Sequence, residues 1–154
     1  MLITVDEFFN SGMPVSDDIR YEEVQQAAET VDEFYLKPRI GDALYISLLE
    51  DPESEPNRTL LMGGTIGERH VAGIKQALFH GVFAYMMVDS IRLTRYSSVE
   101  KDSEYSKNTT EQDRIESARR HWEIMEAFIR EIQDVMEINS QHNNKNNLFD
   151  SLLW

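Results

Sequence analysis

Seven apolar residues recur in alternating steps of three and four along the last long segment of the chain, and this spacing limits what the segment can fold into. A β-strand requires an alternation of two, whereas an average step of 3.5 keeps apolar side chains on one stripe of an α-helix. We therefore predict a helix over residues 110–138 whose heptad seam packs within the subunit or against a neighbour. The seam consists of Ile115, Ala118, Trp122, Met125, Ile129, Ile132 and Met136.

Helical spacing also occurs in the preceding segments. Thr4 is placed to cap a single turn over VDEFF, and Ser16 to cap a helix over 17–36. Residues 40–49 predict a short helix. Residues 68–95 predict the most apolar helix, with apolar side chains on more than one face, which is typical of the buried centre of a bundle.

Polar and glycine-rich segments separate the predicted helices. They are DPESEP at 51–56, the glycine turn MGGTIGE at 62–68 and the polar loop 97–108, and no segment indicates a β-strand. The pattern predicts an all-α fold, a helical bundle with two long antiparallel helices, shorter N-terminal helices and an extended C-terminal tail. We divide it into a body over 1–138 and a tail over 139–154.

Composition narrows the class of protein. The 154 residues indicate one domain, and the absence of cysteine excludes disulfides and cysteine-based metal sites. The net charge of −13 opposes binding to duplex nucleic acid or to anionic membranes, both of which attract clustered Lys and Arg. The first residues lack a basic, apolar leader, and no apolar run reaches the length of a membrane span.

The strongest enzymatic pattern is a pair of acidic motifs on the last helix. The motifs are Glu123 with Glu126 and Glu131 with Asp134, similar to the E-x-x-E and E-x-x-D pairs that hold Mg²⁺ in all-α nucleotide pyrophosphatases. In those enzymes the pairs face each other from two helices. Here they lie on one helix, so the favoured interpretation is a solvated face on which Glu126 pairs with Arg130.

Other catalytic and metal patterns are missing from the sequence. The glycine turn lacks the GK[ST] of a phosphate-binding loop, and no G-x-S-x-G motif occurs. The histidines show no H-x-x-x-H spacing, and His80 and His121 are expected to be core or interface residues. We therefore expect a protein without enzymatic activity, with no catalytic residues, no metal and no cofactor.

The C-terminal tail combines a polar run with an apolar end. Residues 139–147 are almost wholly polar, which favours a flexible tether over a packed element. Large apolar and aromatic side chains typically carry much of an interface's energy. We interpret the end as an anchor for another chain, with folding back onto its own bundle as the alternative. The anchor residues are Leu148, Phe149, Leu152, Leu153 and Trp154.

Three segments together resemble one family of phage structural proteins. They are EFYLKPRIGDALYISLLED at 33–51, LLMGGTIGERHVAGIKQALFHGVFAYMMVDS at 60–90, and SSVEKDSEYSKNTTEQDRIESARRHWEIMEAFI at 97–129. Their order and spacing are similar to those of head–tail connector (adaptor) proteins of tailed phages, in the form found in Bacteroidetes phages and crAss-like phages. The resemblance covers residues 30–138, and the tail does not align.

The resemblance implies a structural virion protein at the head–tail junction, made in the host cytoplasm. It implies a ring of twelve copies below the portal protein that extends the channel for DNA ejection and receives the next tail component. The expected partners are therefore the portal, neighbouring copies and a downstream tail protein, with no specific nucleic-acid binding and no membrane. The polar loop becomes a candidate inter-subunit or channel contact through Lys101, Glu104, Tyr105 and Lys107.

Two other functions remain open from the sequence. A small acidic helical regulatory or immunity-type protein would bind one partner without forming rings. A Mg²⁺-dependent nucleotide pyrophosphatase is the remoter alternative, because its acidic pairs lie on a single helix here.

Overall fold

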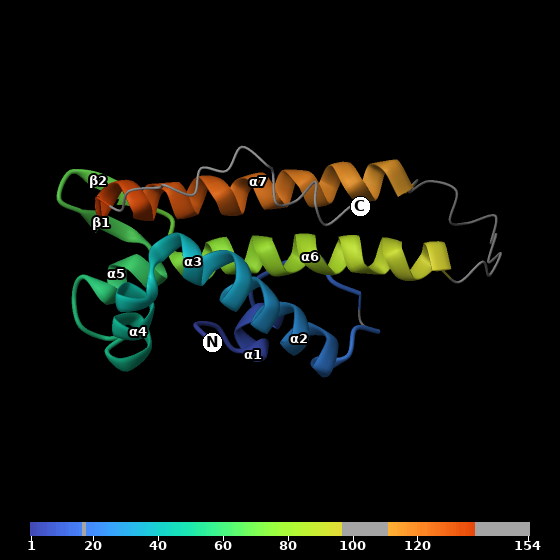
Figure 1. Ribbon diagram of the computed structural model, residues 1–154, viewed down its shortest axis with the longest axis horizontal. Helices are drawn as coiled ribbons and strands as arrows, with labels where there is room; N and C mark the ends of the chain where they lie inside the picture. The colour runs from blue at the N-terminus through green and yellow to red at the C-terminus, as the bar shows by residue number, and fades with distance from the viewer. Residues whose placement is uncertain (17, 97–110, 138–154) are drawn as a thin grey trace.

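The computed structural model of the chain is mostly helical, as predicted, and carries one small two-stranded sheet (Figure 1). It describes residues 1–16, 18–96 and 111–137, with the backbone alone over 90–96. The sheet corrects the prediction that no segment forms a strand. Among the described helices, none combines the length and apolar character needed to cross a membrane.

The chain begins with the short helix α1 (Val5–Phe9), capped as the sequence predicts. The Glu7 amide donates to Thr4 Oγ1 at 3.1 Å, and the Thr4 amide donates to the Glu7 carboxylate at 2.8 Å, which forms a capping box. Phe8 is fully buried, with its ring 6.5 Å from that of Phe79. Lys75 binds the Glu7 carboxylate at 2.6 Å, so α1 is fastened to the long helix behind it.

The next helical segment is divided into α2 (Tyr21–Val31), the π-helical turn η1 (Asp32–Leu36) and α3 (Lys37–Ile40). The predicted start near residue 17 and the Ser16 cap are wrong. Ser16 Oγ accepts from the Asp18 amide at 3.3 Å in a local turn, and α2 begins only after Arg20. The π turn precedes Pro38, which cannot donate an i to i−4 hydrogen bond, so the change in pitch falls where a regular helix would be interrupted.

Two further short helices follow, α4 (Asp42–Glu50) and α5 (Asn57–Met62), and α5 was not predicted. The side-chain amide of Asn57 donates to the carbonyls of Ser47 and Asp51 at 3.0 and 2.9 Å. This buried amide closes the loop between the two helices, because it binds a carbonyl at the end of α4 and another in the residue that follows it.

The glycine-rich segment forms a β-hairpin in place of the predicted turn and helix start. Strand β1 (Gly64–Ile66) pairs antiparallel with β2 (Arg69–Val71), with Gly64 opposite Val71. The hairpin returns the chain to its starting point, so that Gly73 meets the backbone of Gly63. An ideal Cβ on Gly73 would lie 2.6 Å from the Gly63 nitrogen. The central helix therefore begins at residue 74, not at 68.

Two long helices, α6 (Ile74–Tyr96) and α7 (Glu111–Val135), lie side by side (Figure 1). α6 lies between α7 on one side and α1 with α2 on the other. Gly81 brings the two long helices close together, because a side chain there would collide with the Met125 sulfur. α6 therefore occupies the centre of the molecule.

The heptad seam of α7 faces α6 and belongs to the core of this chain. Its members from Ala118 to Ile132 are buried, and Ile115 is half-buried. Met136 lies beyond the end of α7 and is 37% exposed. The sequence left two packing partners possible for the seam, the core of the subunit or a neighbouring subunit. The buried seam residues pack in the core of the subunit.

Candidate functional site

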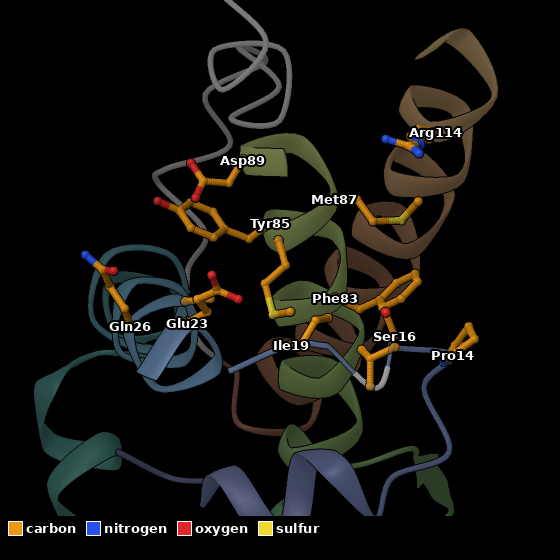
Figure 2. A pocket seen from close by; sticks show the side chains of 13 residues that line it. Pro14, Ser16, Ile19, Glu23, Gln26, Phe83, Tyr85, Met87, Asp89 and Arg114 are labelled. Atoms are coloured by element: carbon orange, nitrogen blue, oxygen red, sulfur yellow. The ribbon is translucent and has the colours of Figure 1, made fainter. Parts of the chain in front are cut away.

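A groove crosses α6 in the described part of the protein, between the segment before α2 and the first turns of α7. Its volume is about 570 Å³. Figure 2 shows Glu23 and Gln26 approaching it from α2, with Arg114 on α7 at the opposite rim. The floor is apolar and comes from Ile19, Phe83, Met86 and Met87.

This groove has the chemistry of a binding surface. Methionine side chains are flexible and polarizable, so a floor with Met86 and Met87 can adapt to an apolar segment. The rim carries both signs of charge, with Asp89 from α6 and Arg114 from α7. The described residues that line the groove include no histidine.

A second cluster lies between the two long helices, where His80 of α6 faces His121 of α7. Their Nδ1 atoms are 2.8 Å apart, and the rings are stacked with centroids separated by 5.1 Å. Both side chains are half-buried. Phe83 packs edge-on against His121 at 4.7 Å, and Phe128 packs against His80 at 5.9 Å.

The surroundings of this histidine pair disfavour a positive charge. Burial lowers the pKa of His80 below its ordinary value, and the nearby His121 lowers it further. Burial also lowers the pKa of His121, and the Arg120 guanidinium acts in the same direction. Both effects favour the neutral form of the two imidazoles.

A third polar group, Asp32, is buried in the π turn. Its side chain is 1% exposed and accepts a hydrogen bond from the hydroxyl of Tyr45, which is also buried. Burial raises the pKa of the Asp32 carboxyl, although the Tyr45 hydrogen bond acts in the opposite direction. The pKa of Tyr45 is raised as well, by burial and then by Asp32. This pair joins η1 to α4.

Asp32→Asn should reduce the pH dependence of the free energy of unfolding. The stability of the variant relative to the wild type should be higher at pH 7 than at pH 4. A raised carboxyl pKa means that stability from the protonated group is present in acid and is lost as the pH rises through that pKa. Asn keeps an oxygen for the Tyr45 hydroxyl and cannot ionise. Urea unfolding at a series of pH values measures this, with exposed Asp42→Asn as the control. Parallel pH curves for wild type and Asp32→Asn would contradict it.

The acidic motifs of α7 contribute to tertiary structure. Glu126 forms an ion pair with Arg39 of α3, which replaces the predicted pairing with Arg130. The Arg130 side chain instead donates to the Glu126 backbone carbonyl at 3.4 Å. Gln133 is buried and donates to the Arg39 carbonyl at 2.9 Å.

The second acidic motif is divided between two environments. The Glu131 carboxylate accepts the Ala72 amide at 3.0 Å, which ties the hairpin end to α7. Asp134 and Glu123 are exposed. Within the described residues, no group of three or more His, Asp or Glu side chains is arranged to hold a metal ion.

Two sets of predicted contact residues lie outside the described residues. They are the loop residues Lys101, Glu104, Tyr105 and Lys107, and the anchor residues Leu148, Phe149, Leu152, Leu153 and Trp154. Their interpretation as contacts with other chains stays a prediction.

Three features of the site were not predicted: the groove, the histidine pair and the Asp32–Tyr45 pair. His80 and His121 are 41 positions apart, so no local spacing links them. Phe83 and Met86 belong to the apolar helix that the sequence predicts as the buried centre of the bundle, so their place in a groove was not predicted.

Together, the fold and these clusters define a small, mostly helical protein whose described part contains a groove, a half-buried histidine pair and the buried Asp32–Tyr45 pair. A model of a family of unknown function (DUF6712) matches residues 36–148, which is more than half of the chain. The chain belongs to this family. Comparison with curated proteins and with solved structures gives no significant match.

Proposed function

We propose that the protein is a structural virion component, a head–tail connector that forms a ring below the portal of a tailed phage. In this role it extends the DNA channel and joins the head to the tail. It has no enzymatic activity and no cofactor, and it resides at the head–tail junction after synthesis in the host cytoplasm. Its partners are the portal protein, neighbouring copies, expected to number twelve, and a downstream tail component.

The observation that carries the proposal is that the three segments resembling connectors pack into one unit. The described part of the first segment contains α3 and α4, that of the second contains the hairpin and most of α6, and that of the third lies in α7. α3 is joined to α7 by Arg39 and Glu126, and α6 is joined to α7 by His80 and His121. The residues that resemble connectors therefore belong to one packed body. This supports the use of the resemblance in proposing a function.

The finer architecture of the proposal is a body built on two long antiparallel helices with an extended C-terminal tail. In this arrangement α6 and α7 form a rigid spine, because their seam is filled by buried residues such as Trp122 and Met125. The tail then provides the contact with the portal or with a neighbouring copy. The spine fixes where the tail begins, at the end of α7.

The charge of the chain is compatible with a ring around DNA. A channel must let the duplex pass, and tight phosphate contacts from Lys and Arg would slow it. The net charge of −13 provides a surface that repels phosphates. In this proposal the protein encloses DNA without binding it specifically.

The second candidate is a small acidic regulatory or immunity-type protein that binds one partner. The groove across α6 favours it, since an apolar floor with a charged rim fits a single partner segment. The pyrophosphatase alternative is weaker, because Glu126 is engaged by Arg39 and Glu131 by the Ala72 amide. Those contacts leave Glu123 and Asp134 as the exposed members of the two acidic motifs.

Electron microscopy of the chain mixed with the portal protein of the same genome tests the proposal. We expect a ring of added density on the portal with the full chain, and no ring with a chain cut after Asn139. The physical reason is that the cut removes the large apolar side chains that would carry the binding energy. Circular dichroism should show that the shortened chain keeps its helical content.

A full-length variant with the five apolar anchor residues changed to Ser is the matched control, since it keeps the tether. It should fail in the same way as the shortened chain if the anchor is responsible. A ring that forms equally well with all three chains would contradict the anchor while supporting the connector. No ring with any chain would contradict the connector and favour the one-to-one binding protein.

A further inference from the structure

The histidine pair contains a bond that depends on its protonation state. Two ring nitrogens 2.8 Å apart can form a hydrogen bond only if one carries a proton and the other is bare. One added proton can bind to another ring nitrogen of the pair, and the hydrogen bond between the two Nδ1 atoms is then kept. A second added proton makes both rings positively charged. Two N–H groups then face each other at hydrogen-bond distance, and the hydrogen bond is lost.

The elements packed around the pair offer little to compensate for that charge. From α6 and α7 the neighbours are the rings of Phe83 and Phe128. α2 contributes apolar Val31, which lies close to the adjacent Gly81.

The described charged groups that act on the pair do not supply a counterion. On α7 the cation Arg120 acts on His121 and opposes its protonation. On α6 Lys75 is bound by Glu7 of α1. Among the described groups that act on either histidine, none is a carboxylate. Glu123 is exposed and lies two positions after His121, which places it on another face of α7.

We propose that the His80–His121 pair is an acid-sensitive latch between α6 and α7, which holds the two helices together while at least one ring is neutral and loosens them when both are protonated. The latch lies in the middle of the seam, close to Trp122 and Met125, so its opening affects the main core of the protein. This inference does not depend on the proposed role in a virion.

The direction of the pH effect follows from the electrostatics. Burial places the folded-state pKa of each histidine below its ordinary value, so the unfolded chain binds protons more readily. The stabilising contribution is complete above the ordinary histidine pKa and is lost as the pH falls through the lowered folded-state values. The two rings share a bond, so they should titrate in two coupled steps and not independently.

Thermal unfolding of the full chain at pH 7.5 and pH 5.0 tests the latch with two matched variants. His121→Gln keeps a hydrogen-bonding side chain opposite His80 and removes one charge. His70→Gln removes an exposed histidine from β2 and serves as the control. We expect the fall in Tm between the two pH values to be unchanged in His70→Gln and reduced to about half or less in His121→Gln. Equal falls in all three proteins would overturn the proposal.

Nuclear magnetic resonance of the wild-type ring protons gives a second readout that needs no variant. The latch predicts two coupled titration steps for His80 and His121, both below the ordinary histidine pKa. Hydrogen exchange of the backbone amides of α6 and α7, corrected for intrinsic rates, should accelerate over the same pH range. Independent titration of the two rings at the ordinary value would contradict the latch even if His121→Gln failed to fold.

Discussion

Trp122→Ala should destabilise the protein by about 3–5 kcal/mol, the range typical of removing a buried aromatic side chain from a core. The Trp122 side chain is 1% exposed, lies in the middle of the α6–α7 seam, and packs edge-on against Tyr35 with ring centroids 4.9 Å apart. Truncation would therefore leave a cavity between three elements, since Tyr35 belongs to η1. Chemical denaturation at pH 7.5 measures the loss.

Glu123→Ala is the matched control for this experiment, because Glu123 is the next residue on α7 and is exposed. Its effect should stay within about 0.5 kcal/mol of the wild type, as is usual for surface substitutions. A cost below about 1 kcal/mol for Trp122→Ala would show that the seam is not the principal core of the protein.

Gly73→Ala should cost about 3 kcal/mol or more, although it adds only one methyl group. The backbone at Gly73 has φ of +103°, which disfavours any L-residue. The new Cβ would also lie 2.7 Å from the Leu61 carbonyl oxygen and 2.6 Å from the Gly63 nitrogen. These are backbone atoms, so the clash cannot be relieved by rotating a side chain, and the hairpin must move away from α6.

Gly41→Ala separates the two causes. Gly41 also has a positive φ, of +87°, but an ideal Cβ there meets no atom within 4 Å. Its cost should be limited to the positive-φ backbone, about 1–3 kcal/mol. Comparable losses for Gly41→Ala and Gly73→Ala would contradict the close crossing of backbones between Gly63 and Gly73. Thermal unfolding of both variants measures the difference.

The elements predicted well are those whose pattern is local and repeated. The apolar seam of α7 extends over more than five helical turns, and so long a repeat predicts a helix. The Thr4 cap of α1 was predictable because Thr4 directly precedes the turn that it caps, whereas the reciprocal bond from Glu7 was not predicted. In both cases the interacting groups are close neighbours in the sequence.

The missed elements depend on short segments or distant partners. Each hairpin strand has three residues, which is too short for an alternation of two to be recognised. The Arg39–Glu126 pair joins residues 87 positions apart. These contacts form only in the folded chain, because the packing of α3 and α6 on α7 brings the partners together. The candidate site was therefore less predictable than the helices that build it.

The attachments of α7 have a mechanical consequence. The last turns of this helix are joined to two remote segments, to the hairpin end through Glu131 and to α3 through Glu126 and Gln133. A force applied to the chain beyond Glu137 would enter α7 at this end and would be divided between both attachments before it reached the apolar seam. The protein is thus braced against tension from its C-terminal side, where a load would otherwise peel α7 from α6 one turn at a time.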